Sequence, residues 1–374
     1  MRLPLLIAAA LMALTICLIL LTRSQPTSAA PPYFSSSFFG IRVDQSVALA
    51  SDGERLVGEL RNMALGARWN SPIDCLPAVG KSRASWTPDE RQWCDDPTIS
   101  GAGVNRNEFA PPVYLAAPDT RTVRVLFVRW DGLPKDVPDL QRAFKEVPIP
   151  PGAQPATGSD GTLIVYQAST DTMWELWKAR RDPQRGWLAD WGGRMRNVST
   201  RDAYYQTTPG TPPYDEQHFW GGPSARIPNL PGLIQLSELE QGVIGHGLVL
   251  AVPKTKEGIW THPAQGTDGS GPSAIMQGQR FRLAPWFDTG RIGNRAVRAI
   301  AEAAQTYGLV VNNGSGAVSL MQENWRPRYA SDPNPRLWQG DNVSFVMKTH
   351  FPWHALQALA RPRTCRDPAK PCLP

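Results

Sequence analysis

The alternation of apolar and polar positions predicts short β-strands along most of this chain. Residues 121–129 alternate charged and apolar side chains, as in a strand with one buried face. Residues 162–167 and 172–179 are two further strand candidates, and the turn-forming sequence Ala-Ser-Thr-Asp at 168–171 separates them. Strands are also predicted at 113–115, 243–252, 280–283 and 309–311. The pattern therefore favours a mainly β fold.

Helical periodicity is expected in a few segments. Apolar residues recur at helical spacing over about 52–64, and residues 51–54 at its start have capping-box spacing. Residues 236–241 predict one or two helical turns, with Gly242 placed as a C-cap. Residues 294–307 form the clearest helix, because an apolar stripe runs along one face and Gly308 follows.

The last part of the chain predicts more β-structure. Residues 312–316, Asn-Asn-Gly-Ser-Gly, have the composition of a tight turn, with 317–321 as the returning strand and 343–347 as a last strand. Glycine (32) and proline (36) are spread along the whole chain, which favours many short strands and turns. We therefore predict a single jelly-roll-type β-sandwich with a few peripheral helices, formed by residues 31–374 with a loop-rich N-terminal part.

Residues 1–30 have the features of an export or anchoring segment. Residues 3–22 are uncharged and lie between Arg2 and Arg23. An apolar run of about 18 residues or more can span a bilayer, whereas the core of a signal peptide is usually about 7–15 residues long. A membrane anchor at 3–22 and a signal peptide cleaved within 27–30 both remain open. Both alternatives predict an extracytoplasmic protein, either anchored or secreted.

Cysteine usage agrees with export. Outside the N-terminal segment, four cysteines fall in two close pairs within proline-rich, loop-like sequence. The simplest of three connectivities joins Cys75 to Cys94 and Cys365 to Cys372 as disulfide bonds. Metal binding is the alternative, but no Cys-x-x-Cys sequence and no nearby histidine supports it.

The charge balance does not indicate a nucleic-acid partner. The chain has 39 basic and 33 acidic residues, and two of the basic ones, Arg2 and Arg23, lie in the N-terminal segment. The remaining small excess is not gathered into runs, unlike the basic patches of nucleic-acid-binding proteins. It is compatible with an acidic polysaccharide partner, and equally with solubility alone.

Tryptophans and carboxylates are combined in the stretch 162–195. It holds four of the fourteen tryptophans, Trp174, Trp177, Trp187 and Trp191, among the carboxylates of Asp171, Glu175 and Asp190. Indole rings pack on the C–H faces of sugars, while acids and amides bond the hydroxyls, so this composition predicts a sugar-binding cleft. A packed aromatic core is the alternative. A third strand is predicted to begin at 187–191 and to bend or end at the glycines 192–193.

The carboxylates are candidates for glycoside hydrolysis, which needs two carboxyl groups roughly 5–9.5 Å apart. Residues four apart on a strand have Cα atoms ~13 Å apart, so Asp171 and Glu175 can act together only across a turn or bulge. Glu175 with Asp190 is the second pairing. Structural roles in a turn and in ion pairs are the alternative. Trp174 and Trp177 should face opposite ways, because side chains alternate along a strand.

His246 is a further candidate, because Gly245 and Gly247 flank it in a predicted strand. A histidine in that setting can act as a general base, or it can be a hydrogen-bonded core residue. Asn312 and Asn313 lie in the predicted tight turn, and a structural role in that turn is the first expectation. If they face the cleft, their amides could instead bind sugar hydroxyls or a structural calcium ion.

Several blocks follow one another between about residues 145 and 320: Val147-Pro-Ile-Pro-Pro-Gly-Ala, Gly158-Ser-Asp-Gly, Met173-Trp-Glu-Leu-Trp, Leu230-Pro-Gly-Leu-Ile with Ser237-Glu-Leu, Gly245-His-Gly-Leu and Tyr307-Gly-Leu-Val-Val-Asn-Asn-Gly-Ser-Gly. Their order resembles that in a group of exported bacterial proteins, most of which lack an assigned activity. No motif of that group is tied to a mechanism, so no catalytic residue is carried over. The general pattern is similar to jelly-roll sandwiches of the lectin and glucanase type, which implies a sugar-binding sheet face.

We therefore predict an extracytoplasmic carbohydrate-active enzyme, a glycoside hydrolase or a polysaccharide lyase. The alternative is a non-catalytic glycan-binding or cell-envelope protein on the same scaffold. A polysaccharide or glycan is the expected partner, as is the membrane if residues 3–22 stay uncleaved, and no cofactor is expected apart from a structural calcium ion. The candidate catalytic residues are Glu175, Asp171, Asp190 and His246, and the candidate substrate-binding residues are Trp177, Trp174, Trp191, Asn312 and Asn313.

Overall fold

The computed structural model describes residues 38–65, 88, 102–200, 205, 221–366 and 372. All of them lie in one compact unit that runs from Pro32 to Pro374. The predicted N-terminal segment and the predicted Cys75–Cys94 disulfide lie outside the described residues. Among the residues that are described, no helix is both long and apolar enough to cross a membrane.

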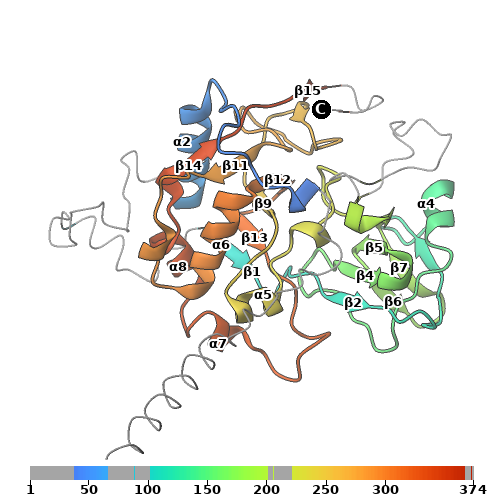
Figure 1. The fold of residues 1–374 in the computed structure, drawn as a ribbon. Helices are drawn as coiled ribbons and strands as arrows, with labels where there is room; N and C mark the ends of the chain where they lie inside the picture. The colour runs from blue at the N-terminus through green and yellow to red at the C-terminus, as the bar shows by residue number, and fades with distance from the viewer. Residues whose placement is uncertain are drawn as a thin grey trace, which may run out of the picture. The chain divides into compact units, whose positions relative to one another are not determined.

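A six-stranded sheet with the order β1-β13-β9-β12-β11-β14 forms the first layer. Its strands are β1 (Gly103–Asn105), β9 (Leu248–Val252), β11 (Arg280–Leu283), β12 (Leu309–Gly314), β13 (Ser319–Met321) and β14 (Leu356–Ala358). Helix α6 (Arg295–Thr306) packs against β11, α2 (Gly53–Leu65) against β14, and α8 (Val343–His350) against β1 (Figure 1). The apolar stripe of α6 is buried there because Val297, Ile300 and Ala304 all face the sheet core.

A second core lies under two smaller sheets. The four-stranded sheet has the order β2-β4-β5-β8, and the three-stranded sheet has the order β3-β7-β6. Their strands, grouped together in Figure 1, are β2 (Val113–Leu115), β3 (Val125–Phe127), β4 (Leu163–Gln167), β5 (Thr172–Trp177), β6 (Arg180–Asp182), β7 (Gly186–Ala189) and β8 (Trp191–Arg196). Asp190 alone separates β7 from β8, so the chain changes sheet at this residue.

The remaining described elements are short. They are η2 (Phe38–Gly40), α4 (Pro138–Ala143), η4 (Ala168–Thr170), η5 (Val198–Thr200), η6 (Leu230–Gly232), α5 (Leu236–Gln241), β10 (Trp260–Thr261), η7 (Thr289–Arg291), α7 (Asn334–Leu337), η8 (Trp353–Ala355) and β15 (Thr364–Cys365). β10 pairs with β15, and the predicted disulfide is formed between Cys365, the last residue of β15, and Cys372.

The prediction of a mainly β fold is confirmed in part: the described residues build several sheets, none of them closed, but with a comparable share of helix. The sheets are mixed rather than purely antiparallel. β12 runs parallel to β9, β1 to β13, β2 to β4, and β3 to β7. A jelly roll is built from antiparallel strands, so the observed pairing does not itself establish that architecture.

The three predicted helices are confirmed within a residue or two as α2, α5 and α6. Gly242 ends α5 with φ 76°, as a C-cap glycine should. The Asn294 side chain caps α6 by accepting a hydrogen bond from the Val297 amide.

Three predictions about local structure are wrong. Residues 343–347 belong to helix α8, which begins where the Asn342 side chain accepts hydrogen bonds from two backbone amides. Asn312 and Asn313 are not in a hairpin turn, because β12 continues to Gly314, and β12 and β13 both pair with β9 rather than with each other. The glycines 192–193 neither end nor bend away the strand, since both lie inside β8.

Trp338 tests the packing of the core around the six-stranded sheet. Its side chain is 0% exposed, and its Nε1 donates to Gln322 Oε1 at 3.0 Å. Trp338→Ala should lower the free energy of unfolding by about 3–5 kcal/mol, through the cavity and the unpaired amide oxygen. Urea denaturation measures the change. Trp286, which is 68% exposed, provides the control: Trp286→Ala should cost less than about 1 kcal/mol. Equal losses in the two variants would contradict the packing described here.

Candidate functional site

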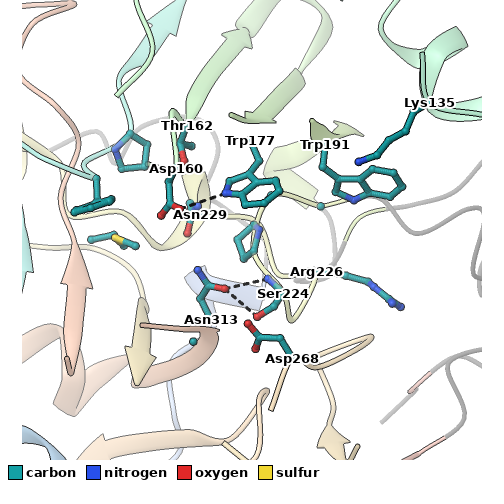
Figure 2. Close-up of a pocket in the computed structure, with 17 residues that line it drawn as sticks. Lys135, Asp160, Thr162, Trp177, Trp191, Ser224, Arg226, Asn229, Asp268 and Asn313 are labelled. Atoms are coloured by element: carbon teal, nitrogen blue, oxygen red, sulfur yellow. Dashed lines mark hydrogen bonds between the residues drawn. The ribbon is translucent and has the colours of Figure 1, made fainter. Parts of the chain in front are cut away.

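A cavity of about 620 Å³, called the cleft below, is lined by residues of the four-stranded and the six-stranded sheet. Trp177 of β5 and Trp191 of β8 come from the first sheet, and Asn313 and Gly314 of β12 come from the second. Loop residues complete the wall (Figure 2). Pockets that bind small ligands commonly have volumes of ~300–1,000 Å³, so the cleft is large enough for a ligand.

The two cleft tryptophans are direct cross-strand neighbours. Trp177 pairs with Trp191 in the antiparallel register of β5 and β8, which puts both side chains on one face of the sheet. Both are half-buried, and Figure 2 shows their rings side by side. Lysines lie over the rings: Lys178 Nζ is 4.5 Å from the ring centroid of Trp177, and Lys135 Nζ is 5.1 Å from that of Trp191. These cation–π contacts favour fixed ring positions.

Polar groups hold this aromatic wall in place. The Trp177 Nε1–H donates to Asp160 Oδ1 at 3.3 Å, and the Lys135 ammonium donates to the Asp190 carbonyl at 2.6 Å. Burial lowers the pKa of Lys135; the charge of Asp190 raises it, and that of Lys178 lowers it further. Lys135 and Asp160 therefore bring one cation and one carboxylate to the tryptophan side of the cleft.

The opposite side of the cleft is a chain of hydrogen-bonding side chains. The amide and the hydroxyl of Ser224 both donate to Asn313 Oδ1, at 3.1 and 2.9 Å. Gln277 Nε2 donates to the Ser224 hydroxyl at 2.7 Å and to Asp268 Oδ1 at 2.6 Å. Gly314 makes room for Asp268, because a Cβ there would lie 3.1 Å from a carboxylate oxygen. This wall presents Asp268, Ser224 and Asn313 to the cleft (Figure 2).

Glu175 lies one layer behind the cleft and is fully buried. Its carboxylate accepts hydrogen bonds from the Asn229 side chain at 2.6 Å, from the Asn229 amide at 3.1 Å, and from the Tyr205 hydroxyl. Burial raises the pKa of Glu175 to about 7, against the lowering effect of these hydrogen bonds. Gly222 lies between this carboxylate and the cleft, and a Cβ at that position would be 2.8 Å from Glu175 Oε1.

Asn229 joins this buried carboxylate to the six-stranded sheet. Its side chain lines the cleft, donates to Glu175 of β5, and accepts from Asn312 Nδ2 of β12 at 2.9 Å. The Tyr205 ring takes the place that a side chain at Gly193 would fill, since a Cβ there would lie 2.6 Å from the ring. The Glu175 network therefore fixes Asn229 from two sheets at once.

The structure does not bring the predicted catalytic residues together. Asp171, in the left-handed region with φ 42°, accepts hydrogen bonds from the Tyr166 hydroxyl and from Ser199. Asp190 forms an ion pair with Arg180 at 2.7 Å. Neither residue lines the cleft.

His246 has a separate environment. It precedes β9 rather than lying in it, and its side chain is 0% exposed. Its Nδ1 lies 2.7 Å from the Gly247 carbonyl, and its Nε2 lies 3.1 Å from Glu238 Oε2. This arrangement is that of a hydrogen-bonded core histidine. Glu175, Asp171, Asp190 and His246 therefore do not share one site. The catalytic roles predicted for them stay predictions.

The predicted substrate-binding residues divide between the cleft and the interior. Trp177, Trp191 and Asn313 line the cleft, whereas Asn312 is buried behind it. Trp174 is on the other face of β5, is 7% exposed, and donates from Nε1 to the Ala143 carbonyl. Alternation along the strand separates Trp174 from Trp177, as expected.

Sequence reasoning missed most of the polar residues that line the cleft, among them Asp160, Asp268, Ser224 and Asn229. Asp160 and Asp268 lie within glycine-rich loop sequences, Gly158-Ser-Asp-Gly and Gly266-Thr-Asp-Gly. That composition indicates turns first, so it does not distinguish a functional loop from a structural one. Within the described part of the chain, no group of three or more His, Cys, Asp or Glu side chains is arranged to hold a metal ion.

Comparisons with models of protein families, with curated proteins and with solved structures find no match to this chain. The geometry of the cleft therefore carries the functional argument.

The buried Glu175 carboxyl should make stability depend on pH. Its pKa is about 7 in the folded protein, against an ordinary value of 4.5. Between these values the folded state keeps the proton and the unfolded state loses it. The free energy of unfolding should therefore fall as pH rises from 4.5 to about 7, by up to ~1.4 kcal/mol per pH unit, and should change no further above that range.

Glu175→Gln tests this, because an amide cannot ionise. The variant's urea-denaturation profile should be flatter than that of the wild type between pH 4.5 and 7. The difference between the profiles isolates Glu175 from Glu323, whose pKa burial also raises. Glu257→Gln, at an exposed glutamate, is the control and should keep the wild-type slope. An unchanged slope in Glu175→Gln would show that the carboxyl titrates normally.

Proposed function

We propose that this is an extracytoplasmic protein that binds a polysaccharide or oligosaccharide chain in the cleft. The observation that carries the proposal is the side-by-side pair Trp177 and Trp191 facing a wall of hydrogen-bonding side chains. A sugar ring offers an apolar C–H face and a rim of hydroxyl groups. Such a ligand needs an aromatic surface and several polar partners together, as this cleft provides.

The polar wall suits hydroxyl groups, which both donate and accept. Asp160 and Asp268 carry carboxylate oxygens that accept, Ser224 has a hydroxyl that does both, and Lys135 donates. These groups are already held by protein partners, so little side-chain entropy is lost when a ligand binds.

Glycoside hydrolysis or lyase chemistry is the second candidate, and the two cleft carboxylates favour it. Asp160 lies on the tryptophan side and Asp268 on the opposite side (Figure 2). A chain bound between them would have one carboxyl group on each side, as acid–base cleavage requires. This assignment replaces Glu175 and His246 as the reacting groups, because both of these are fully buried.

We also propose that the architecture is of the jelly-roll type and that the chain is related to exported bacterial β-sandwich proteins. The support is the pair of sheets that flank a ligand-sized cleft, as in sugar-binding sandwiches. The parallel strand pairs count against a strict jelly roll.

Removing either cleft indole should weaken sugar binding. Trp177→Ala and Trp191→Ala are each expected to raise the Kd for an oligosaccharide roughly tenfold or more, since a stacked indole contributes on the order of 1.4 kcal/mol or more. A panel of cell-wall and plant oligosaccharides would be titrated, with calorimetry as the readout. Trp286→Ala, far from the lining residues in sequence and exposed, should bind like the wild type. If no member of the panel binds the wild type, or if the indole variants bind normally, the proposal fails.

The enzymatic candidate has its own test. With a substrate found in the panel, Asp160→Asn and Asp268→Asn should each reduce reducing-end release, or the 235 nm absorbance of a lyase product, by roughly 100-fold or more. Asp182→Asn is the control, because Asp182 lies outside the cleft and is bonded to its own turn. Tight binding by the wild type without any turnover would leave the glycan-binding function and remove the enzymatic one.

A further inference from the structure

A hairpin at residues 128–134, called the Trp130 hairpin below, presents two large apolar side chains to solvent. Trp130 is 87% exposed, which makes it the most exposed of the large apolar residues that the structure describes, and Leu133 is 57% exposed. An antiparallel bridge between Val128 and Pro134 closes the loop that carries them. A side chain this exposed adds little to the stability of the fold, so Trp130 is available for contact with another molecule.

The Trp130 hairpin is held in shape by hydrogen bonds. The Arg129 amide donates to the Leu133 carbonyl at 2.8 Å, and the Gly132 amide donates to the Arg129 carbonyl at 2.9 Å. Arg185 holds the tip from outside, because its guanidinium donates to the Gly132 carbonyl at 2.9 Å. The backbone around Trp130 is therefore ordered before any ligand arrives, which reduces the entropy lost on binding.

Both ends of the hairpin are fixed next to the aromatic wall of the cleft. Pro134 is followed by Lys135, whose Nζ lies 5.1 Å from the ring centroid of Trp191. On the strand that enters the hairpin, the Val128 amide donates to the Ala189 carbonyl at 3.0 Å, two residues before Trp191. The hairpin is thus attached at the Trp191 end of the cleft.

The residues of the aromatic wall form a row that ends at the Trp130 hairpin. Trp177 and Trp191 are cross-strand neighbours, and Lys135 lies over the second ring. Figure 2 shows these three side chains one after another along one side of the cleft. Trp130 is five residues before Lys135, and its Cα lies at most ~18 Å from that of Lys135, since a chain spans no more than ~3.6 Å per residue. A chain ligand that continues past Trp191 therefore comes within reach of the hairpin.

We propose that Trp130 is an outer subsite for a saccharide chain that occupies the cleft, and that the ligand is accordingly a polysaccharide rather than a mono- or disaccharide. This inference rests on the function proposed above. An exposed indole packs on the C–H face of a sugar ring in the same way as an indole of the cleft. Lys135, between the hairpin and Trp191, is placed to donate a hydrogen bond to a hydroxyl group of the intervening sugar.

A lipid surface is the other partner that an exposed tryptophan and leucine suit, since both residue types enter the membrane interface. Attraction to anionic lipids would need basic side chains beside the tip. Arg129 is instead ion-paired with Asp131, at 3.1 Å. Arg185 is ion-paired with Asp182, at 3.5 Å. These pairs and the nearby aromatic row favour the saccharide.

Oligosaccharides of two lengths test the outer subsite. Disaccharides and hexasaccharides of glucose, xylose and N-acetylglucosamine, all β-1,4-linked, would be titrated by calorimetry against the wild type and Trp130→Ala. The wild type should bind a hexasaccharide more tightly than the disaccharide of the same series. Trp130→Ala should raise the Kd of the hexasaccharide roughly fivefold or more and leave that of the disaccharide within about twofold, because only the longer chain reaches the hairpin.

Two further variants of the same hairpin serve as controls. Leu133→Ala removes an exposed apolar side chain without removing a ring, and it should leave both Kd values within about twofold. Trp130→Phe keeps a ring and should recover most of the affinity for the hexasaccharide. All these side chains are exposed, so thermal melting of each variant should match that of the wild type.

The outcomes separate this inference from the function on which it rests. If Trp177→Ala weakens both lengths while Trp130→Ala weakens neither, the outer subsite is wrong and the glycan-binding cleft stands. If Trp130→Ala weakens both lengths equally, the hairpin supports the cleft and is no separate subsite. If the wild type sediments with phosphatidylserine vesicles and Trp130→Ala and Leu133→Ala both abolish this, with hexasaccharide binding unchanged, the hairpin is a membrane contact. If none of the oligosaccharides binds the wild type, both proposals fail.

Discussion

A carboxylate taken out of water has to be satisfied by its neighbours, and Glu175 imposes this constraint on the centre of the molecule. The partners that hold it are neutral: the Tyr205 hydroxyl and two donors of Asn229. Asn229 in turn accepts a hydrogen bond from Asn312 of β12. The hydrogen bonding of Glu175, a residue of β5, is therefore supported in part by the six-stranded sheet. Asn229 lines the cleft between these sheets, and hydrogen bonds to residues of both sheets hold its side chain in place.

The packing around Glu175 explains why two positions near the cleft are glycines. Gly193 admits the Tyr205 ring, and Gly222 admits the Glu175 carboxylate, since a Cβ at either position would lie within 2.8 Å of those groups. Glycine loses more conformational entropy on folding than other residues do. Hydrogen bonds that only a close approach allows offset this loss. A carboxyl held this way is suited to positioning Asn229 rather than to reacting with a ligand. Its raised pKa is a consequence of burial and does not by itself indicate catalysis.

Local sequence rules predicted the elements that depend on local interactions. Helices α5 and α6 carry caps, helix α2 has a periodic apolar face, and strands β2 and β11 match their predicted bounds. Residues 343–347 misled the strand prediction because Val343, Phe345 and Met347 alternate, whereas the cap at Asn342 and packing against β1 decide for a helix. The partner of β12 could not be predicted either. Parallel pairing with β9 depends on a crossover through α6, which no short-range pattern specifies.

The aromatic part of the candidate site could be predicted from the sequence, because side chains alternate along a strand. Period-two alternation assigns Trp174 and Trp177 to different faces, and register then adds Trp191 to the face of Trp177. The same rule assigns Arg194 and Arg196 to the face of Trp174, so one sheet supplies two chemically different surfaces. Asp160 and Asp268 follow no such rule, because loops are positioned by tertiary contacts such as the bonds from Trp177 and Gln277. An aromatic strand can therefore reveal where the proposed saccharide would lie, whereas the residues that would decide between binding and cleavage are set by the fold around it.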